Sequence, residues 1–197
     1  MLANPDKFQA ITLNRNSGAS IQSFQIGDVT IVPSSEVKML GFTLDDKLTF
    51  KSHIKTVCSK AARQVNALQR ISSYLNTDTK LAIYECFIKA NFNYGPYIYH
   101  FTGISEARML EKVHERALRV VFNDFYTPYV QLLDKHNKLS LYEQRVNNVI
   151  QMVFKILHGD APPLQADFFT YINAPYNLRE PMLCQHTLNT QSYGVSC

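Results

Sequence analysis

The chain of 197 residues lacks the signatures of several large protein classes. It has no apolar run of about 20 residues, the length that a membrane-spanning helix needs. Residues 1–7 show none of the apolar core of a signal peptide. We therefore expect a protein with no membrane partner that works inside the cell, in the nucleus or the cytoplasm.

Paired cysteines are also missing. The four cysteines, Cys58, Cys86, Cys184 and Cys197, never occur at the close spacing of a zinc site. Cys58 and Cys86 lie in apolar helical patterns, which predicts that both are small core residues. The sequence thus predicts no metal ligands and no cofactor in this chain.

Motifs for phosphate binding, hydrolysis and zinc proteolysis are absent, since no GxxxxGK[ST], GxSxG or HExxH pattern occurs. Asp45 and Asp46 are adjacent acids, but a two-metal centre needs a third carboxylate from another strand. The first 44 residues offer only Asp6, Asp28 and Glu36. The pair also precedes a predicted helix, whose positive end favours carboxylates. We predict no catalytic residue in this chain.

Acidic residues are missing from one whole helix. Residues 51–70 contain no Asp or Glu and show the period of an amphipathic helix. Its apolar arc consists of Ile54, Val57, Cys58, Ala61, Val65 and Leu68. Outside this arc lie Lys51, Lys55, Lys60, Arg63 and Arg70. Solvated faces usually mix both signs, because opposite charges at i,i+4 add a few tenths of a kcal/mol.

The surrounding segment, Lys38 to Lys80, has eight Lys/Arg against three Asp/Glu. This local excess predicts non-specific contact with a polyanion, of which nucleic-acid backbone is the commonest. A solvated face that only aids solubility is the alternative.

A second basic stripe, on a helix predicted over 105–122, consists of Arg108, Lys112, Arg116 and Arg119. Glu111 and Glu115 lie beside it, and Glu115 can pair with Arg119 at i+4. We predict that this stripe is a self-neutralised surface.

Two further groups favour packing over chemistry. His53 and His114 have no nucleophile or carboxylate partner at motif spacing, so surface or packing roles are favoured. The aromatic run from Phe92 to Phe101 could stack bases, but aromatics this dense more often form a core layer or an interface.

The pattern along the chain predicts an α+β fold, with a small antiparallel β-sheet followed by a helical bundle. Strands are expected at 7–13, 21–24, 29–32 and 37–44. Helices are expected at 51–70, from 77 to 92, at 105–122, at 129–135 and from 140 to 158, the last opened by a Ser140–Glu143 capping box. The predicted domains are 1–46, 47–160 and a C-terminal tail at 161–197.

The stretch KMLGFTLDDKLTFKSHI, residues 38–54, resembles the palm-to-thumb junction in reverse transcriptases of LINE-type, jockey-like, non-LTR retrotransposons. There the pattern is roughly K-x-L-G-x-x-[IL]-D-x-x-L-x-F-x-x-H-I. FNYG at 92–95, LEKVHERALR at 110–119 and NTQSYG at 189–194 are similar to later segments of that family, in the same order.

The resemblance implies that 1–46 is a palm remnant, that 47–160 is a thumb-like domain, and that Lys38, Leu40 and Gly41 shape a primer grip. The implied partners are an RNA/DNA template–primer, held by the basic helix, and the missing fingers and palm of the parent polymerase. The family's aromatic-x-Asp-Asp hairpin would precede Asn4, so this chain is expected to be inactive alone, and Mg²⁺ is expected only in the complete polymerase.

A different reading remains open. The alternative hypothesis is a degenerate element remnant that acts at most as a protein-interaction module, with Tyr94, Tyr97 and Tyr99 uncovered.

Overall fold

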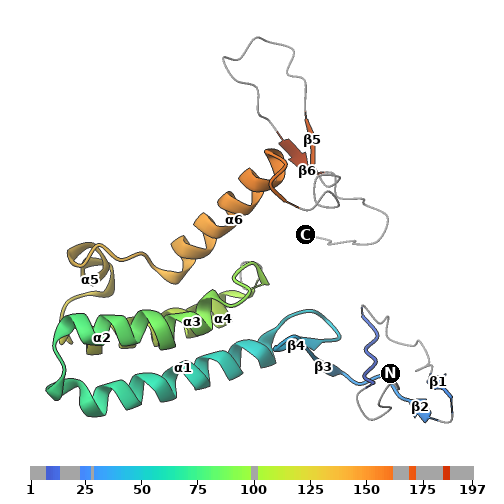
Figure 1. Cartoon of the computed structure of the whole chain (residues 1–197), viewed down its shortest axis with the longest axis horizontal. Helices are drawn as coiled ribbons and strands as arrows, with labels where there is room; N and C mark the ends of the chain where they lie inside the picture. Colours follow the sequence, from blue (N-terminus) through green and yellow to red (C-terminus); the bar gives the residue numbers. More distant parts are fainter. Residues whose placement is uncertain are drawn as a thin grey trace. The chain divides into compact units, whose positions relative to one another are not determined.

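The computed structural model describes residues 8–13, 23–27, 29–98, 102–161, 169–171 and 184–186. Contacts between residues divide the chain into two compact units, Met1–Val146 and Asn147–Cys197. The expected α+β class is confirmed (Figure 1). The NTQSYG pattern at 189–194 and Tyr99 lie outside the described residues.

The predicted antiparallel pairing is present, but the described strands form separate two-stranded hairpins and not one sheet. Strands β1 (Phe24–Ile26) and β2 (Val29–Ile31) pair antiparallel, with Gly27 at a positive φ of 59° between them. The prediction of a strand at 7–13 is wrong for the described residues 8–13. There, Ile11 forms only an isolated parallel β-bridge with Ser34.

The strand predicted over 37–44 is two strands. β3 (Glu36–Met39) and β4 (Phe42–Asp45) pair antiparallel around Leu40 and Gly41, whose φ angles are 49° and 85°. Positive φ at both central residues is typical of a type I′ turn, which matches the right-handed twist of the flanking strands. Glycine adopts such a φ without strain, which explains Gly41. The Leu40–Gly41 hairpin implied by the resemblance is therefore present.

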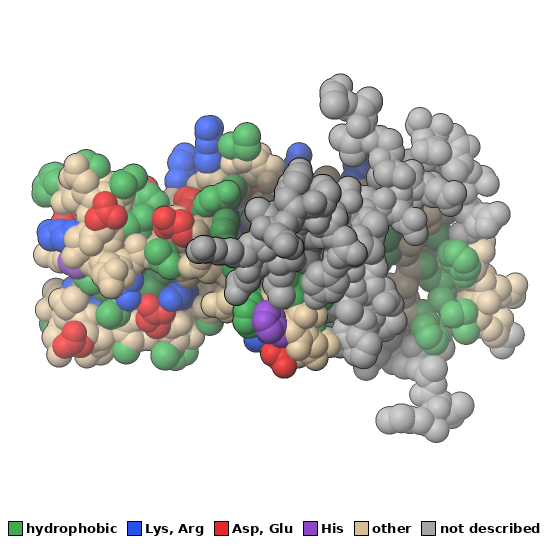
Figure 2. Space-filling view, turned by 90° about the horizontal axis from the view of Figure 1, so that it is seen from above, with side chains coloured by type: hydrophobic (Ala, Val, Ile, Leu, Met, Phe, Trp, Pro, Cys, Tyr) green, Lys and Arg blue, Asp and Glu red, His purple; other side chains and the backbone are tan. Residues whose placement is uncertain are grey.

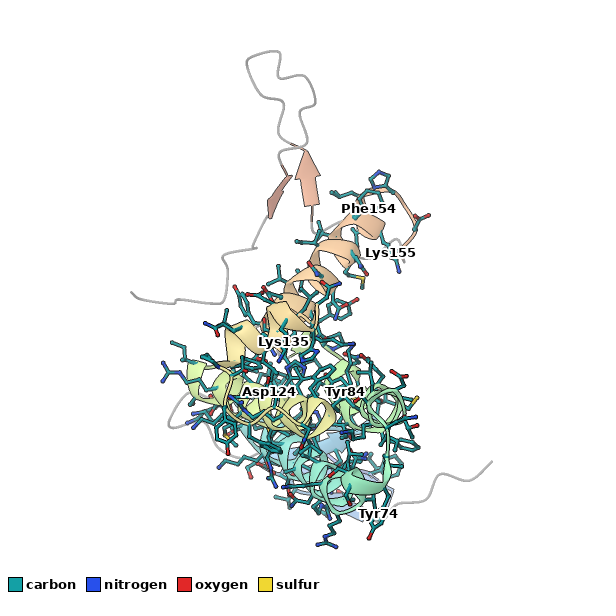
Figure 3. All side chains as sticks on the ribbon, turned by 90° about the vertical axis from the view of Figure 1, so that its left-hand side faces the viewer. Tyr74, Tyr84, Asp124, Lys135, Phe154 and Lys155 are labelled. Atoms are coloured by element: carbon teal, nitrogen blue, oxygen red, sulfur yellow. The ribbon has the colours of Figure 1, made fainter. Side chains whose placement is uncertain are left out.

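Helix α1 (Lys51–Ile71) confirms the predicted amphipathic helix within one residue. All six residues of the predicted apolar arc are buried, together with His53. The short 3₁₀ turn η2 (Ser72–Tyr74) follows, and Tyr74 is 87% exposed at the outer edge of the bundle (Figure 3).

The next predicted helix is interrupted by a wider turn. α2 (Thr77–Ile83), capped by the Asn76 side chain, leads into the π-helical segment η3 (Tyr84–Ile88) and then α3 (Lys89–Asn93). Its buried positions are Lys80, Tyr84, Ile88 and Phe92, four residues apart. In an α-helix, side chains four residues apart differ in direction by about 40° around the helix axis. The wider π-helical turn compensates for this drift and keeps the four side chains on one face.

The exposure of Cys86 corrects the prediction that it is a core residue. Cys86 lies two positions from both Tyr84 and Ile88, which are buried, and therefore on the opposite side of η3. Cys58 is buried as predicted, and its burial raises the pKa of the thiol to about 11.

Helices α4 (Ile104–Phe122) and α5 (Tyr129–Lys135) match their predicted ranges, and α6 (Leu141–Leu157) begins at the predicted capping box, where Ser140 N and Glu143 Oε2 are 2.8 Å apart. The Asp124–Lys135 ion pair, at 3.0 Å, joins the end of α4 to α5 (Figure 3). α1 packs against α3 and α4, and in Figure 1 the β3–β4 hairpin lies at the N-terminal end of α1. The shared core draws on α1, α2, η3, α3, α4, α5 and Leu141.

In the second unit, β5 (Phe169–Tyr171) and β6 (Cys184–His186) pair antiparallel. Neither strand is among those expected from the sequence. Within the described ranges, none of the helices combines the length and hydropathy needed to span a bilayer.

Candidate nucleic-acid interface

The five cations of α1 all lie on its solvent side. Lys51, Lys55, Lys60, Arg63 and Arg70 are each exposed. At about 100° per residue they spread over roughly half of the circumference, centred opposite the buried arc. No carboxylate in the described part of the chain lies within 4 Å of these five ammonium or guanidinium groups. We call these five residues the basic face.

Acids approach the N-terminal end of the basic face from neighbouring elements. The Ser105 hydroxyl, and more weakly the charges of Lys51 and Lys55, lower the pKa of the Glu106 carboxyl on α4. Glu36 Oε2 accepts a hydrogen bond from Ser52 Oγ at 3.2 Å. The middle and C-terminal part of the face, from Lys60 to Arg70, therefore has the stronger positive potential.

The second stripe, on α4, behaves largely as predicted. Arg119 Nη2 donates to Glu115 Oε1 at 2.6 Å, which confirms the expected pair. Arg116 donates to Asn66 of α1, so this side chain ties two helices together. Arg108 and Lys112 are exposed. The end of the bundle with α2 and α5, at the left of Figure 2, likewise mixes acidic and basic side chains.

The predicted primer-grip residues sit on a hairpin that is fixed from α3. Tyr94 Oη donates to the Leu40 carbonyl oxygen at 2.5 Å, and the Tyr94 ring stacks on Phe42 with centroids 4.9 Å apart. A Cβ on Gly41 would lie 3.3 Å from Tyr94 Cε1. A side chain at 41 would therefore disturb both the turn and the stacked tyrosine.

In the described part of the aromatic run, residues 92–98, packing contacts are present, as favoured from the sequence. Phe92 is buried, and Tyr94 packs on the hairpin although 53% of it is exposed. Gly95 has a φ of 64°, and a Cβ there would lie 2.3 Å from Phe42 Cζ. Only glycine fits this position, so the chain turns tightly beneath the hairpin.

A groove with a volume of about 640 Å³ lies between the β3–β4 hairpin, α1 and the η3–α3 segment. It brings Lys38 and Gly41 of the predicted primer grip together with Lys60 of the basic face. Leu40 does not line the groove and is 81% exposed at the tip of the hairpin. The remaining lining residues are Thr43, His53, Thr56, Val57, Gln64, Cys86, Phe87, Ala90, Asn91 and Tyr94.

Asp45 has a structural role in the turn before α1. Its carboxylate accepts hydrogen bonds from Thr49 N at 2.9 Å, Phe50 N at 2.6 Å and Lys47 N at 3.2 Å. Burial alone would raise the pKa of this carboxyl, but the hydrogen bonds outweigh it and lower the pKa. Among the described residues, no group of three or more His, Cys, Asp or Glu is placed to hold a metal ion.

Two known proteins are similar to this chain. An uncharacterized protein of Caenorhabditis elegans is 26% identical over 133 residues, which cover 66% of this chain and 67% of that protein. A probable RNA-directed DNA polymerase from transposon BS of Drosophila melanogaster is 27% identical over 121 residues, 60% of this chain but 13% of the polymerase. No family model matches, and no solved structure matches.

The similarity to the transposon polymerase indicates a common origin. It agrees in part with the resemblance drawn from the motifs at 38–54 and 110–119. The matched region is a small part of the polymerase, so the activity of that whole protein is not carried over with it.

A buried polar network was missed by the sequence reasoning. His114 is fully buried on α4, and its Nδ1 and Nε2 lie 2.8 Å from Tyr129 Oη and 2.6 Å from Tyr84 Oη. Tyr129 Oη donates to Glu111 Oε2 at 2.8 Å. Hence Tyr129 Oη accepts from the Nδ1–H of His114, and Nε2 is hydrogen-bonded to Tyr84 Oη. Burial raises the pKa of both tyrosine hydroxyls. The partners come from distant segments, so motif spacing gave no signal.

Glu111 was predicted to balance the second stripe, but it faces the start of α6. Its carboxylate accepts hydrogen bonds from Tyr142 N at 2.7 Å and Leu141 N at 3.2 Å. Its role is therefore to cap a helix that begins 30 residues further along the chain.

Proposed function

We propose that this chain binds the sugar-phosphate backbone of an RNA/DNA template–primer duplex, as the thumb and primer-grip part of a LINE-type, jockey-like, non-LTR retrotransposon reverse transcriptase. The observation that carries the proposal is the basic face, with five exposed cations and no paired acid among the described residues. The similarity to a transposon RNA-directed DNA polymerase supports it.

The contact would be with phosphates and not with bases. Lysine ammonium groups act as point charges, and such contacts position a duplex without reading its sequence. In the proposal, the β3–β4 hairpin holds the strand near Lys38, Leu40 and Gly41, and α1 follows the duplex. Lys60 lines the groove beside Lys38 and Gly41, so hairpin and helix present one continuous surface.

Nucleotide addition by these 197 residues alone is not part of the proposal. The resemblance assigns the catalytic carboxylates and their Mg²⁺ to a segment before Asn4. The fingers and the rest of the palm are the proposed protein partner.

The test is a fluorescence anisotropy titration of a labelled RNA/DNA duplex at several salt concentrations. Backbone binding predicts that log K falls linearly with log salt, with a slope of about −0.9 for each phosphate neutralised on B-DNA and a similar slope here. The double variant Lys60→Gln, Arg63→Gln should weaken binding and make the slope of log K against log salt less negative by the amount expected for about two phosphate contacts.

The matched control is Arg108→Gln, Lys112→Gln, which removes the same charge from the exposed stripe on α4. It should change affinity far less. Equal losses from both pairs would mean that net charge alone drives binding, and a salt-independent affinity would refute the proposal.

One observation favours the alternative of a protein-interaction module. Large apolar side chains are exposed on elements other than α1, among them Tyr126 at 97% and Val130 at 68%. If the purified chain self-associates in light scattering and shows no nucleic-acid binding, this alternative is favoured.

A further inference from the structure

The groove has features that a purely backbone-binding surface does not need. Its volume of about 640 Å³ lies within the range of about 300–1,000 Å³ that small-molecule sites occupy. A duplex lying along α1 would contact exposed lysines without entering it. We therefore infer that the groove binds a ligand other than the duplex.

The charge of the groove selects an anionic occupant. Lys38 and Lys60 enter from β3 and α1, and none of the described lining residues is acidic. His53, which also lines the groove, accepts a hydrogen bond from Thr43 N at 3.4 Å through Nδ1, and burial lowers the pKa of its imidazole. A phosphate is the anion that two lysines from different elements suit.

One wall of the groove presents an aromatic ring. Phe87, in the π-helical segment, is 62% exposed and lines the groove with Val57 and Ala90. Tyr84 and Ile88 of the same segment are buried, whereas the Phe87 ring is exposed. No aromatic ring among the described residues stacks on it. Stacking on such a ring is how proteins bind unpaired bases of any sequence.

Two amides supply polar groups beside that ring. Asn91 Nδ2 donates to Gln64 Oε1 at 2.6 Å and to the Phe87 carbonyl oxygen at 2.7 Å. This leaves Gln64 Nε2 and Asn91 Oδ1, a donor and an acceptor, without a hydrogen bond to the described residues. Adjacent donors and acceptors suit the edge of a nucleobase.

We propose that this groove accepts one unpaired nucleotide, with its base on Phe87, its edge at Gln64 and Asn91, and its phosphate between Lys38 and Lys60. A paired base cannot enter, because its edge is already bonded to its partner. The inference rests on the proposed function, since the strand is the one that the basic face holds. Lys60 belongs to both surfaces, so a strand can leave the duplex and enter the groove there.

The test compares three labelled probes in anisotropy at one salt concentration: a blunt RNA/DNA duplex, the same duplex with a four-nucleotide single-stranded overhang, and that overhang with abasic sites. The wild-type chain should bind the overhang about fivefold or more tighter than the blunt duplex, the lower end of stacking one base on an aromatic ring. The abasic overhang should lose this gain.

Phe87→Ala should abolish the preference for the overhang and leave blunt-duplex affinity within twofold. The matched control, Tyr74→Ala, removes an exposed aromatic ring outside the groove and should keep the preference. Thermal melting by circular dichroism checks that Phe87→Ala is folded, and Gln64→Leu, which removes the free donor, provides a second variant.

The outcomes separate the two proposals. Equal affinity for blunt and overhang probes, with salt-dependent binding intact, overturns the nucleotide groove and keeps the backbone interface. Failure to bind any probe overturns both. A glutamate-rich peptide that binds wild type but not Phe87→Ala, while the overhang confers no gain, would make the groove a peptide site and overturn the inference.

Discussion

Replacing Glu111 by glutamine should destabilise the bundle far more than its place on a charged stripe indicates. Glu111 reaches from α4 to the first turn of α6, where Leu141 N and Tyr142 N have no partner within their own helix. The same carboxylate accepts the hydrogen bond of Tyr129 Oη from α5. One side chain thus joins three helices.

The magnitude follows from the hydrogen bonds. Bonds to charged groups contribute about 1.5–3 kcal/mol each, and Glu111 accepts three at 2.7–3.2 Å. Its side chain is 23% exposed, so solvent screens it only in part. Glutamine keeps one acceptor oxygen but turns an NH₂ group toward N–H or O–H donors. The expected loss for Glu111→Gln is about 2–4 kcal/mol in the free energy of unfolding.

Urea unfolding followed by far-UV circular dichroism at pH 7 measures this loss. Glu143→Gln is the matched control, because Glu143 caps the same helix start from within α6 and is exposed. It should cost only about 0.5–1 kcal/mol. If the two substitutions cost the same, the long-range cap contributes nothing beyond a local one, and the reasoning fails.

The pH dependence gives an independent check with a definite sign. Burial would raise the pKa of the Glu111 carboxyl, but the nearby His114 imidazole and the hydrogen bonds from Tyr129, Tyr142 and Leu141 lower the pKa below the usual value of 4.5. A lowered folded-state pKa stabilises the fold above pH 4.5, and this contribution is lost as the pH falls through the folded pKa. The difference in the free energy of unfolding between wild type and Glu111→Gln should therefore become smaller below about pH 4.5.

Three further predictions concern the hairpin and the cysteines. Gly95→Ala should lose about 2–4 kcal/mol in urea unfolding, because its φ is positive and its Cβ would meet Phe42; wild-type stability would contradict this. Asp45→Asn should lose about 1–2 kcal/mol at pH 7, with the loss shrinking as acid protonates wild-type Asp45, whose folded pKa is lowered; a pH-independent difference would count against it. Iodoacetamide with peptide mass spectrometry should alkylate Cys86 in the native chain and Cys58 only after unfolding, and the reverse order would show that the exposures are wrong.

The parts of the fold that follow from local periodicity were predictable. The buried arc of α1, the bounds of α5 and the Ser140–Glu143 cap each depend on residues within a few positions of one another. The exposure of the basic face follows from the same period, because cations outside an apolar arc must face solvent. Binding by that face, and the domain boundaries at 46 and 160, remain predictions.

The features that sequence could not supply depend on contacts between distant residues. The π-helical segment contacts α4 through Tyr84 Oη and His114 Nε2, 30 residues apart, and Asn91 just after it contacts Gln64 of α1, 27 residues away. The sequence predicted one strand from Val37 to Leu44, because Met39 and Phe42, on either side of the turn, are both apolar. The glycine at 41 was the available signal, since an isolated glycine within a strand pattern favours a turn or bulge.

The wider turn at η3 links the buried core to the candidate site. With Lys80, Tyr84, Ile88 and Phe92 all buried, Cys86 and Phe87 between them are exposed and line the groove. π-Helical turns occur often at functional sites, because they place a side chain where an α-helix would not. The same helix ends at Tyr94, which fixes the Leu40–Gly41 hairpin. The α2–η3–α3 segment therefore forms one wall of the groove and fixes the hairpin that forms another, while Tyr84 of the same segment is hydrogen-bonded to the buried His114.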